Sequence, residues 1–134
     1  MKHSNPLDLV TEAVKLIGGS EVARTAQVLG ADVGTADDGT SFLGTQPAPG
    51  VYLIQILDRD GDDRIDDIVL RLSQPVALSE LVTRLGGYQT PASSGHRQVH
   101  DVWFTTEDAV VTARCDRPPG PDSAVVEIFI RPAR

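Results

Sequence analysis

The N-terminal part of the chain has the hydrophobic spacing of an amphipathic helix. Apolar side chains recur at intervals of three and four residues, which places them on one helical face: Val10, Ala13, Val14 and Ile17. Asn5 is a good N-cap, Pro6 suits the first turn, and Gly18 can end the helix. The pattern therefore predicts a helix over residues 5–18 with one buried face.

Two shorter stretches have the same spacing. The first is predicted to begin at Ser20 as N-cap and to end at Gly30. The second covers Leu78–Leu85 and ends at Gly86. Their inward positions are the apolar ones of each stripe: Val22, Ala26 and Leu29 in the first, and Leu78, Leu81, Val82 and Leu85 in the second.

Elsewhere apolar and polar residues alternate, which is the period of a β-strand with one buried face. The alternation predicts a hairpin around an acidic turn, and three further strands over residues 99–105, 109–115 and 124–131. The side chains expected to point toward the core are Tyr52, Ile54, Ile56, Ile68, Leu70, Leu72, Val102, Phe104, Val111, Ala113, Val126, Ile128 and Ile130. Trp103 has the opposite parity and is expected on the less buried face of the sheet.

Glycine and proline interrupt the regular patterns in two places. Residues 31–50 are predicted to form a long loop with a short strand at Ser41–Gly44, and residues 86–95 a second loop. Loops of this length are uncommon in small domains and tend to carry function.

The order of elements repeats along the chain. A helix that ends in Leu-Gly is followed each time by a polar loop and by antiparallel strands, with Ile68–Arg71 corresponding to Ile128–Arg131. This predicts an α+β fold of one domain, residues 1–134, with an antiparallel sheet, helices packed on one face and two candidate αββ(β) repeats at 20–73 and 76–131. The alternative is that any α+β chain produces similar spacing.

The segment Leu78–Gly86 has the pattern Leu-x-x-Leu-Val-x-x-Leu-Gly, and a polar loop and an antiparallel meander follow it. In this order of elements, residues 20–131 resemble the helix-plus-sheet units of BamE-type lipoproteins and of the beta-lactamase inhibitor proteins, which carry two such units in tandem. The resemblance implies a non-enzymatic fold whose concave sheet and loops bind another protein. The disulfides of the secreted inhibitors have no counterpart, because Cys115 is the single cysteine of the chain.

The chain has 134 residues, 19 acidic and 12 basic side chains, and a formal net charge of −7. Residues 58–67 account for −4 of this charge, since they hold six aspartates and two arginines. The acidity argues against nucleic acid and against an anionic membrane surface as partners, because both are negatively charged. Charged residues interrupt the N-terminal apolar stretch, and no apolar stretch reaches the length of a spanning helix, so we expect a cytoplasmic protein.

The acidic segment 58–67 has acids at the positions used by a calcium-binding EF-hand loop. Calcium prefers six to eight oxygen ligands. The acids at loop positions 1, 3, 5 and 9 are Asp58, Asp60, Asp62 and Asp66. Two positions depart from the pattern, because Asp63 replaces the glycine of the sharp turn and Val69 replaces the last glutamate. The segment is thus either a calcium site, the one cofactor considered, or a hairpin loop that caps its own backbone.

Candidate catalytic groups are few. His96 and His100 are four residues apart, which in a strand is about 13 Å and too far for one metal ion. Cys115, His100 and Asp101 could supply a thiol, a base and an orienting group. The strand parity of Cys115 instead favours a buried, inert thiol. A small hydrolase or ligand-binding enzyme is therefore less favoured than a binding protein.

The leading hypothesis is a non-enzymatic protein-binding module of the inhibitor or immunity kind that recognises a basic partner. Acidic loops accelerate association with basic proteins, and Trp and Tyr are enriched at binding hot spots. The residues expected to contact the partner are Asp60, Asp62 and Asp63 in the acidic loop, Trp103 on the sheet and Tyr88 in the second loop.

Overall fold

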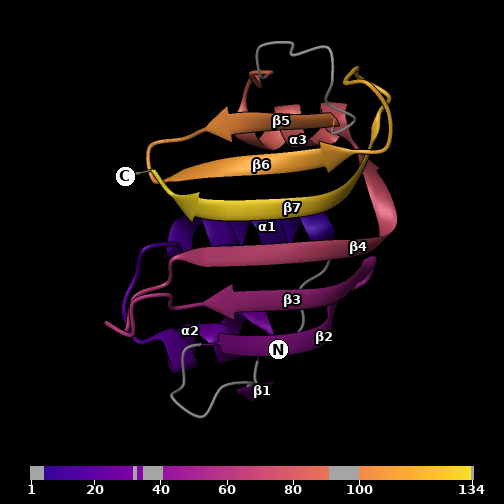
Figure 1. Cartoon of the computed structure of the whole chain (residues 1–134). Helices are drawn as coiled ribbons and strands as arrows, with labels where there is room; N and C mark the ends of the chain where they lie inside the picture. The colour runs from indigo at the N-terminus through magenta and orange to yellow at the C-terminus, as the bar shows by residue number, and fades with distance from the viewer. Residues whose placement is uncertain (1–4, 32, 35–40, 91–99, 134) are drawn as a thin grey trace.

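The computed structural model describes residues 5–31, 33–34, 41–90 and 100–133. In these residues three helices lie behind a seven-stranded antiparallel sheet, whose other face is turned toward the viewer in Figure 1. The elements in chain order are α1 (Pro6–Leu16), α2 (Val22–Leu29), β1 (Val33–Gly34), β2 (Ser41–Ala48), β3 (Val51–Leu57), β4 (Asp67–Ala77), α3 (Leu78–Leu85), β5 (His100–Thr105), β6 (Ala109–Cys115) and β7 (Ala124–Pro132). The predicted α+β fold, an antiparallel sheet with helices on one face, is confirmed.

Helix α1 begins at the predicted residue. The Asn5 side chain accepts the backbone N–H of Asp8 at 2.9 Å, and Pro6 occupies the first helical position, where an N–H would have no helical partner. The helix ends at Leu16, and its buried residues Leu9, Val10 and Ala13 face the sheet. The predicted amphipathic face therefore covers the middle of the sheet, behind β4 and β7 in Figure 1.

The core fills the space between the sheet and the helices. Its large, fully buried side chains alternate along the strands: Ile54, Ile56, Ile68, Leu70, Phe104, Ile128 and Ile130. Because successive side chains of a strand point to opposite faces, the residues between them point to the uncovered face. We call this side of the sheet, which no helix of the described residues covers, the open face.

The strand order is symmetric about the β4–β7 pair for six of the seven strands, with β1 added at one edge. It runs β1-β2-β3-β4-β7-β6-β5, so the last strands of the two halves, β4 and β7, pair with each other. Val69 lies directly opposite Phe129 in this antiparallel pair. A local two-fold axis between these two residues brings Ile68–Arg71 onto Ile128–Arg131, the correspondence predicted from the sequence.

In the first half, the loop between β3 and β4 caps the start of α2. The carboxylate of Asp63 accepts the backbone N–H groups of Glu21 and Val22 at 3.1 and 3.0 Å. Ile65 is fully buried, and its backbone exchanges hydrogen bonds with Gly18 and Gly19 at 2.9 and 3.0 Å. The loop therefore fastens the α1–α2 connection to the sheet.

In the second half, the loop between β6 and β7 does the same for α3. The N–H groups of Leu78 and Ser79 donate to the carbonyls of Ser123 and Pro121 at 2.9 and 3.1 Å. Each repeat thus closes the N-terminus of its helix with the loop that joins its second and third strands.

Several sequence predictions are wrong because long-range contacts decide the local structure. The predicted N-cap of α2, Ser20, instead forms a bridge with Arg64, and the cap position is Glu21 in a left-handed conformation. Tyr52 is 48% exposed, since the pairing of β3 with β4 shifts between Val51 and Leu53. Val51 takes the inward position that alternation assigned to Tyr52.

The same kind of shift affects β7. Cys115 pairs with Val125 after an irregularity, so Val125 is fully buried and Val126, the predicted inward residue, is not.

The predicted long loop over residues 31–50 contains an eight-residue strand, β2. Gly44 is required there by packing, because a Cβ at this position would lie 1.7 Å from the carbonyl oxygen of Gly30. Pro47 lies within the irregularity between Thr45 and Ala48 in the pairing of β2 with β3, where a proline does not interrupt the regular ladder. Gly44 and Pro47, which indicated a loop in the sequence, thus lie at positions of β2 that accommodate glycine and proline.

Replacing Asp63 by alanine should destabilise the fold by about 2 kcal/mol. The substitution removes the two acceptors at the start of α2, and alanine disfavours the φ of 64° that the backbone has at this position. Asp63→Asn retains one acceptor and tolerates this conformation, so its loss should be smaller. Urea unfolding in calcium-free buffer measures both. Equal midpoints for the wild type and Asp63→Ala would contradict the capping role.

Candidate functional site

The acidic loop is folded around the carboxylate of Asp58. This residue directly follows β3, is only 4% exposed, and accepts the backbone N–H groups of Gly61, Asp62 and Asp63 at 2.9, 3.2 and 2.8 Å. Gly61 and Asp63 have positive φ values of 69° and 64°. The loop therefore caps its own backbone, as the second of the two sequence interpretations predicted.

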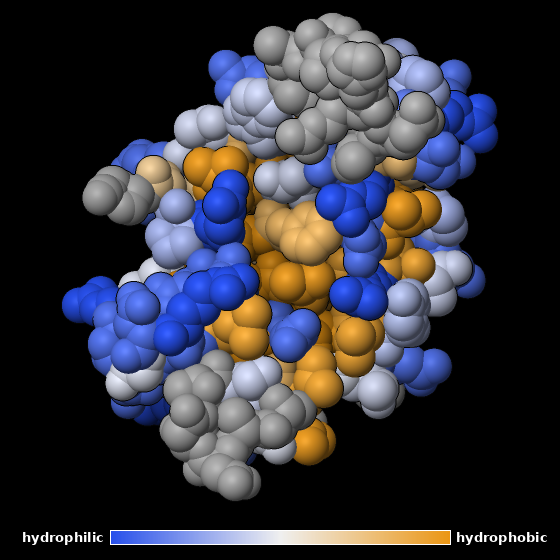
Figure 2. Space-filling view, in the orientation of Figure 1, coloured by the Kyte–Doolittle hydropathy of each residue, from blue (hydrophilic) through white to orange (hydrophobic). Residues whose placement is uncertain are grey.

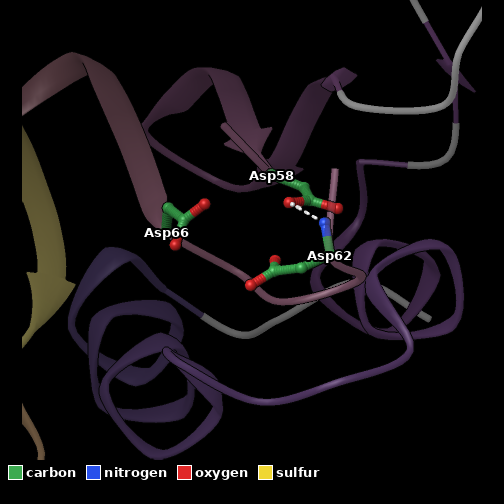
Figure 3. A group of neighbouring side chains, drawn as sticks. All are labelled: Asp58, Asp62 and Asp66. Carbon is green, nitrogen blue, oxygen red and sulfur yellow. Dashed lines mark hydrogen bonds between the residues drawn. The ribbon is translucent and has the colours of Figure 1, made fainter. Parts of the chain in front are cut away.

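Three of the four predicted metal ligands also converge. Asp58, Asp62 and Asp66 each offer an oxygen atom, and these atoms lie within 4.8 Å of one another (Figure 3). Asp60 is not part of this group. The Asp66 carboxylate also accepts the N–H of Arg59 at 2.7 Å, which holds it beside the loop. The geometry brings the carboxylates of loop positions 1, 5 and 9 together.

The two departures from the EF-hand pattern have different consequences. Asp63 at position 6 adopts the left-handed conformation that glycine usually provides, so the sharp turn is present. Val69 at position 12 lies in β4 on the open face and offers no side-chain oxygen. A cation at this site would therefore depend on backbone carbonyls and water to complete its coordination.

An open pocket of about 590 Å³ lies between the acidic loop and the end of the sheet. Its lining is mostly charged: Arg59, Asp60, Asp66, Asp67, Val110, Arg131 and Pro132. Arg59 forms an ion pair with Asp67, and this hydrogen bond raises the pKa of the guanidinium further, so it stays charged. No described residue forms a hydrogen bond or an ion pair with the side chain of Asp60. The pocket therefore has one exposed carboxylate that is not paired within the described structure.

The open face carries a row of half-exposed side chains across the centre of the sheet, four of them apolar. Strand pairing aligns Leu43, Gln55, Val69, Phe129, Thr112 and Trp103, one from each of six strands. Figure 2 shows this face with an apolar centre and hydrophilic residues around it. No described helix lies over it (Figure 1).

A ladder of four charged side chains runs beside this apolar row, and we call it the charge ladder. It consists of Arg71, Glu127, Arg114 and Asp101, on the neighbouring strands β4, β7, β6 and β5. Successive members form ion pairs of 3.1, 3.2 and 3.0 Å. The Arg114 guanidinium also lies 5.2 Å above the ring of Phe129. The charges on this part of the open face therefore neutralise one another.

The predicted partner residues fall in different environments. Asp60 and Asp62 are exposed, whereas the carboxylate of Asp63 is used to cap α2. Trp103 lies on the open face and donates its indole N–H to Gln89 at 2.6 Å. Tyr88 packs against the core with its ring edge-on to Phe104, 6.0 Å away, so it does not share a surface with Trp103.

The candidate catalytic residues do not converge. His100 and Cys115 are opposite each other in the β5–β6 pairing, but Asp101 points to the open face and binds Arg114. Burial raises the pKa of the Cys115 thiol, and the nearby charges of Asp116 and Asp101 raise it further. A raised thiol pKa is the opposite of nucleophile activation. His96 lies outside the described residues.

Sequence reasoning missed the charge ladder and the pocket. Asp101 and Trp103 alternate with the inward residues of their strand, and Arg114 alternates with the inward residues of the next strand. This alternation was the available signal that the three side chains share a face. Which charges meet depends on strand order and register, and neither is a local property of the chain.

No family model, curated protein or solved structure matches the chain. The likeness to BamE-type and inhibitor-protein units therefore stays a prediction. Within the described part of the chain, no helix has both the length and the apolar character needed to cross a membrane.

The Cys115 thiol should react slowly in the folded protein. Reaction needs the thiolate, and burial both raises the pKa of this thiol and shields its sulfur, so at pH 8 the folded protein should react at least about 100-fold more slowly than the urea-unfolded chain. A colorimetric disulfide reagent measures both rates. His100→Ala should leave the folded rate unchanged, whereas a slower rate in this variant would indicate an activated thiol–imidazole pair.

Proposed function

We propose that the protein is a non-enzymatic binding module, of the inhibitor or immunity kind, that recognises a basic protein through the acidic loop. The observation that carries the proposal is the pocket beside this loop, where the unpaired carboxylate of Asp60 faces solvent. A lysine or arginine side chain of a partner would find three carboxylates there, those of Asp60, Asp66 and Asp67. Two arginines line the same pocket, and one of them is already paired with Asp67.

The chemistry of the pocket lining favours a protein side chain over a small apolar ligand. Small-molecule sites are mostly apolar with a few polar groups. Five of the seven lining residues here are charged, and only Val110 and Pro132 are apolar. A charged pocket at a surface loop is better suited to an exposed basic side chain that approaches under electrostatic steering.

The loop has a rigid frame for such a contact. Hydrogen bonds to Asp58 and the buried side chain of Ile65 hold the backbone around Asp60 and Asp62. A preorganised loop loses less conformational freedom on binding, which favours affinity. We expect this encounter in the cytoplasm, since the single cysteine requires no oxidising compartment.

The test is capture of a partner on the immobilised chain from a lysate of the native host, followed by measurement of its dissociation constant. Asp60→Asn should weaken binding about fivefold, the effect of removing one interfacial charge worth about 1 kcal/mol, and added salt should weaken it further. Asp122→Asn, an exposed aspartate in the loop between β6 and β7, is the matched control and should bind as the wild type does. Recovery of no partner, or of one indifferent to Asp60→Asn and to salt, would refute the proposal.

Calcium binding is the second candidate function, and the convergence of Asp58, Asp62 and Asp66 favours it. Close carboxylates repel one another, and a divalent cation between them would relieve this repulsion. Calcium would also leave the Asp63 cap of α2 in place, because that carboxylate lies outside the group of three.

Calcium should then raise the melting temperature of the wild type, by an amount equivalent to about 2.7 kcal/mol at a concentration 100 times the dissociation constant. Asp62→Asn should abolish the effect, since it removes an exposed member of the group without disturbing the buried Asp58. Asp60→Asn should retain most of it. Thermal melts with calcium and with chelator decide the question, and identical melts of the wild type under both conditions would exclude the site.

A further inference from the structure

The open face has an apolar centre and no net charge along its ladder, which is unusual for the surface of a chain with a net charge of −7. A basic partner gains little from this face, because Asp101 and Glu127 already pair with Arg114. The side chains Val69, Phe129 and Trp103 lie in one row beside these pairs. The face therefore suits a partner that is apolar in the middle and carries both signs of charge.

The order of charges in the ladder has a specific symmetry. From β4 to β5 it reads positive, negative, positive, negative, for Arg71, Glu127, Arg114 and Asp101. Reversing this order exchanges every arginine with an acid. A second ladder laid over the first in the opposite direction would place Arg71 on Asp101 and Glu127 on Arg114.

Only one kind of two-fold axis produces this match. An axis parallel to the strands, above the boundary between β7 and β6, reverses the strand order and so sets opposite charges against each other. A two-fold axis in the same plane but perpendicular to the strands would place each strand on the same strand of the second copy. Arg71 of one copy would then face Arg71 of the other. The strand-parallel axis also keeps the two sets of strands nearly aligned, as in β-sandwiches.

We infer that the open face is a self-association surface, on which a second copy of this chain packs through β4, β7, β6 and β5 about a two-fold axis parallel to the strands. In this arrangement Val69 of one copy faces Trp103 of the other, and Phe129 faces Thr112. The two apolar rows then cover each other, and the two matched ladders face each other beside them.

The size of the overlap sets the expected strength. Four strands spaced by about 4.8 Å, with about 20 Å of common length, give a flat footprint of about 400 Å² on each copy. This is below the roughly 800 Å² per partner of a standard stable interface. The dimer should therefore be weak, and the fraction of dimer should rise with protein concentration.

The acidic loop borders this surface, because the pocket beside the loop is also lined by Asp67, Val110 and Arg131 of the same strands. Asp60 and Asp62 lie in the loop beyond the ends of β3 and β4, outside the four-strand overlap. A strand-parallel axis would carry the two acidic loops of a dimer to the same end of the sandwich.

Sedimentation velocity between about 1 µM and about 500 µM tests the inference. The wild type should shift from the 14.3 kDa mass of one chain toward twice that mass. Val69→Lys should remain a monomer throughout the range, because it places a charge in the apolar row. Val28→Lys, a matched change at an apolar residue 50% exposed on α2, should dimerise as the wild type does.

Thr112→Arg, on strand β6, is a second variant designed to disrupt the dimer. Thermal melts at low protein concentration will test whether both variants fold. A monomer at every concentration, or a dimer that persists in both variants, would overturn the inference. Asp60→Asn should leave the mass distribution unchanged whatever it does to partner capture. If the wild type stays monomeric while Val69→Lys blocks capture of the basic protein, the open face belongs to that partner, and self-association is refuted.

Discussion

The capping of α2 and of α3 by loops of the sheet is the constraint on which the arrangement of this protein depends. The first amide groups of a helix have no partners within the helix and need acceptors from elsewhere. In the first repeat the carboxylate of Asp63 supplies them to α2, and in the second repeat the carbonyls of Ser123 and Pro121 supply them to α3. The position of each helix over the sheet is thus set by the loop between the second and third strands of its own repeat.

This constraint explains why the acidic loop combines structural and exposed aspartates. The carboxylates of Asp58 and Asp63 accept hydrogen bonds from backbone N–H groups, so the loss of these bonds would disrupt the local structure. Asp60 and Asp62 are held at the surface by the same folded loop. The local excess of negative charge therefore has two parts, one committed to the fold and one available to other molecules.

The sequence predicted the elements better than it predicted their contacts. The helices and the inward positions Ile54, Ile68 and Ile128 follow from periodicity, which is a local property. The cap of α2 could not be predicted, because Asp63 is 42 residues from Glu21 along the chain. Strand irregularities displaced Tyr52 and Val126 for a related reason, since a bulge depends on the neighbouring strand. Of the candidate site, the convergence of three aspartates was foreseeable from their spacing, whereas the pocket and the charge ladder required the register of distant strands.

The central pairing of β4 with β7 has a consequence for how the chain is made. The edge of β4 that faces β7 belongs to residues 67–77, and its natural partner, residues 124–132, is synthesised last. Until β7 arrives, the nascent first half presents an uncovered row of N–H and C=O groups in the middle of the future sheet, a template that another strand can occupy. The centre of the sheet therefore closes only after residues 124–132 have been made.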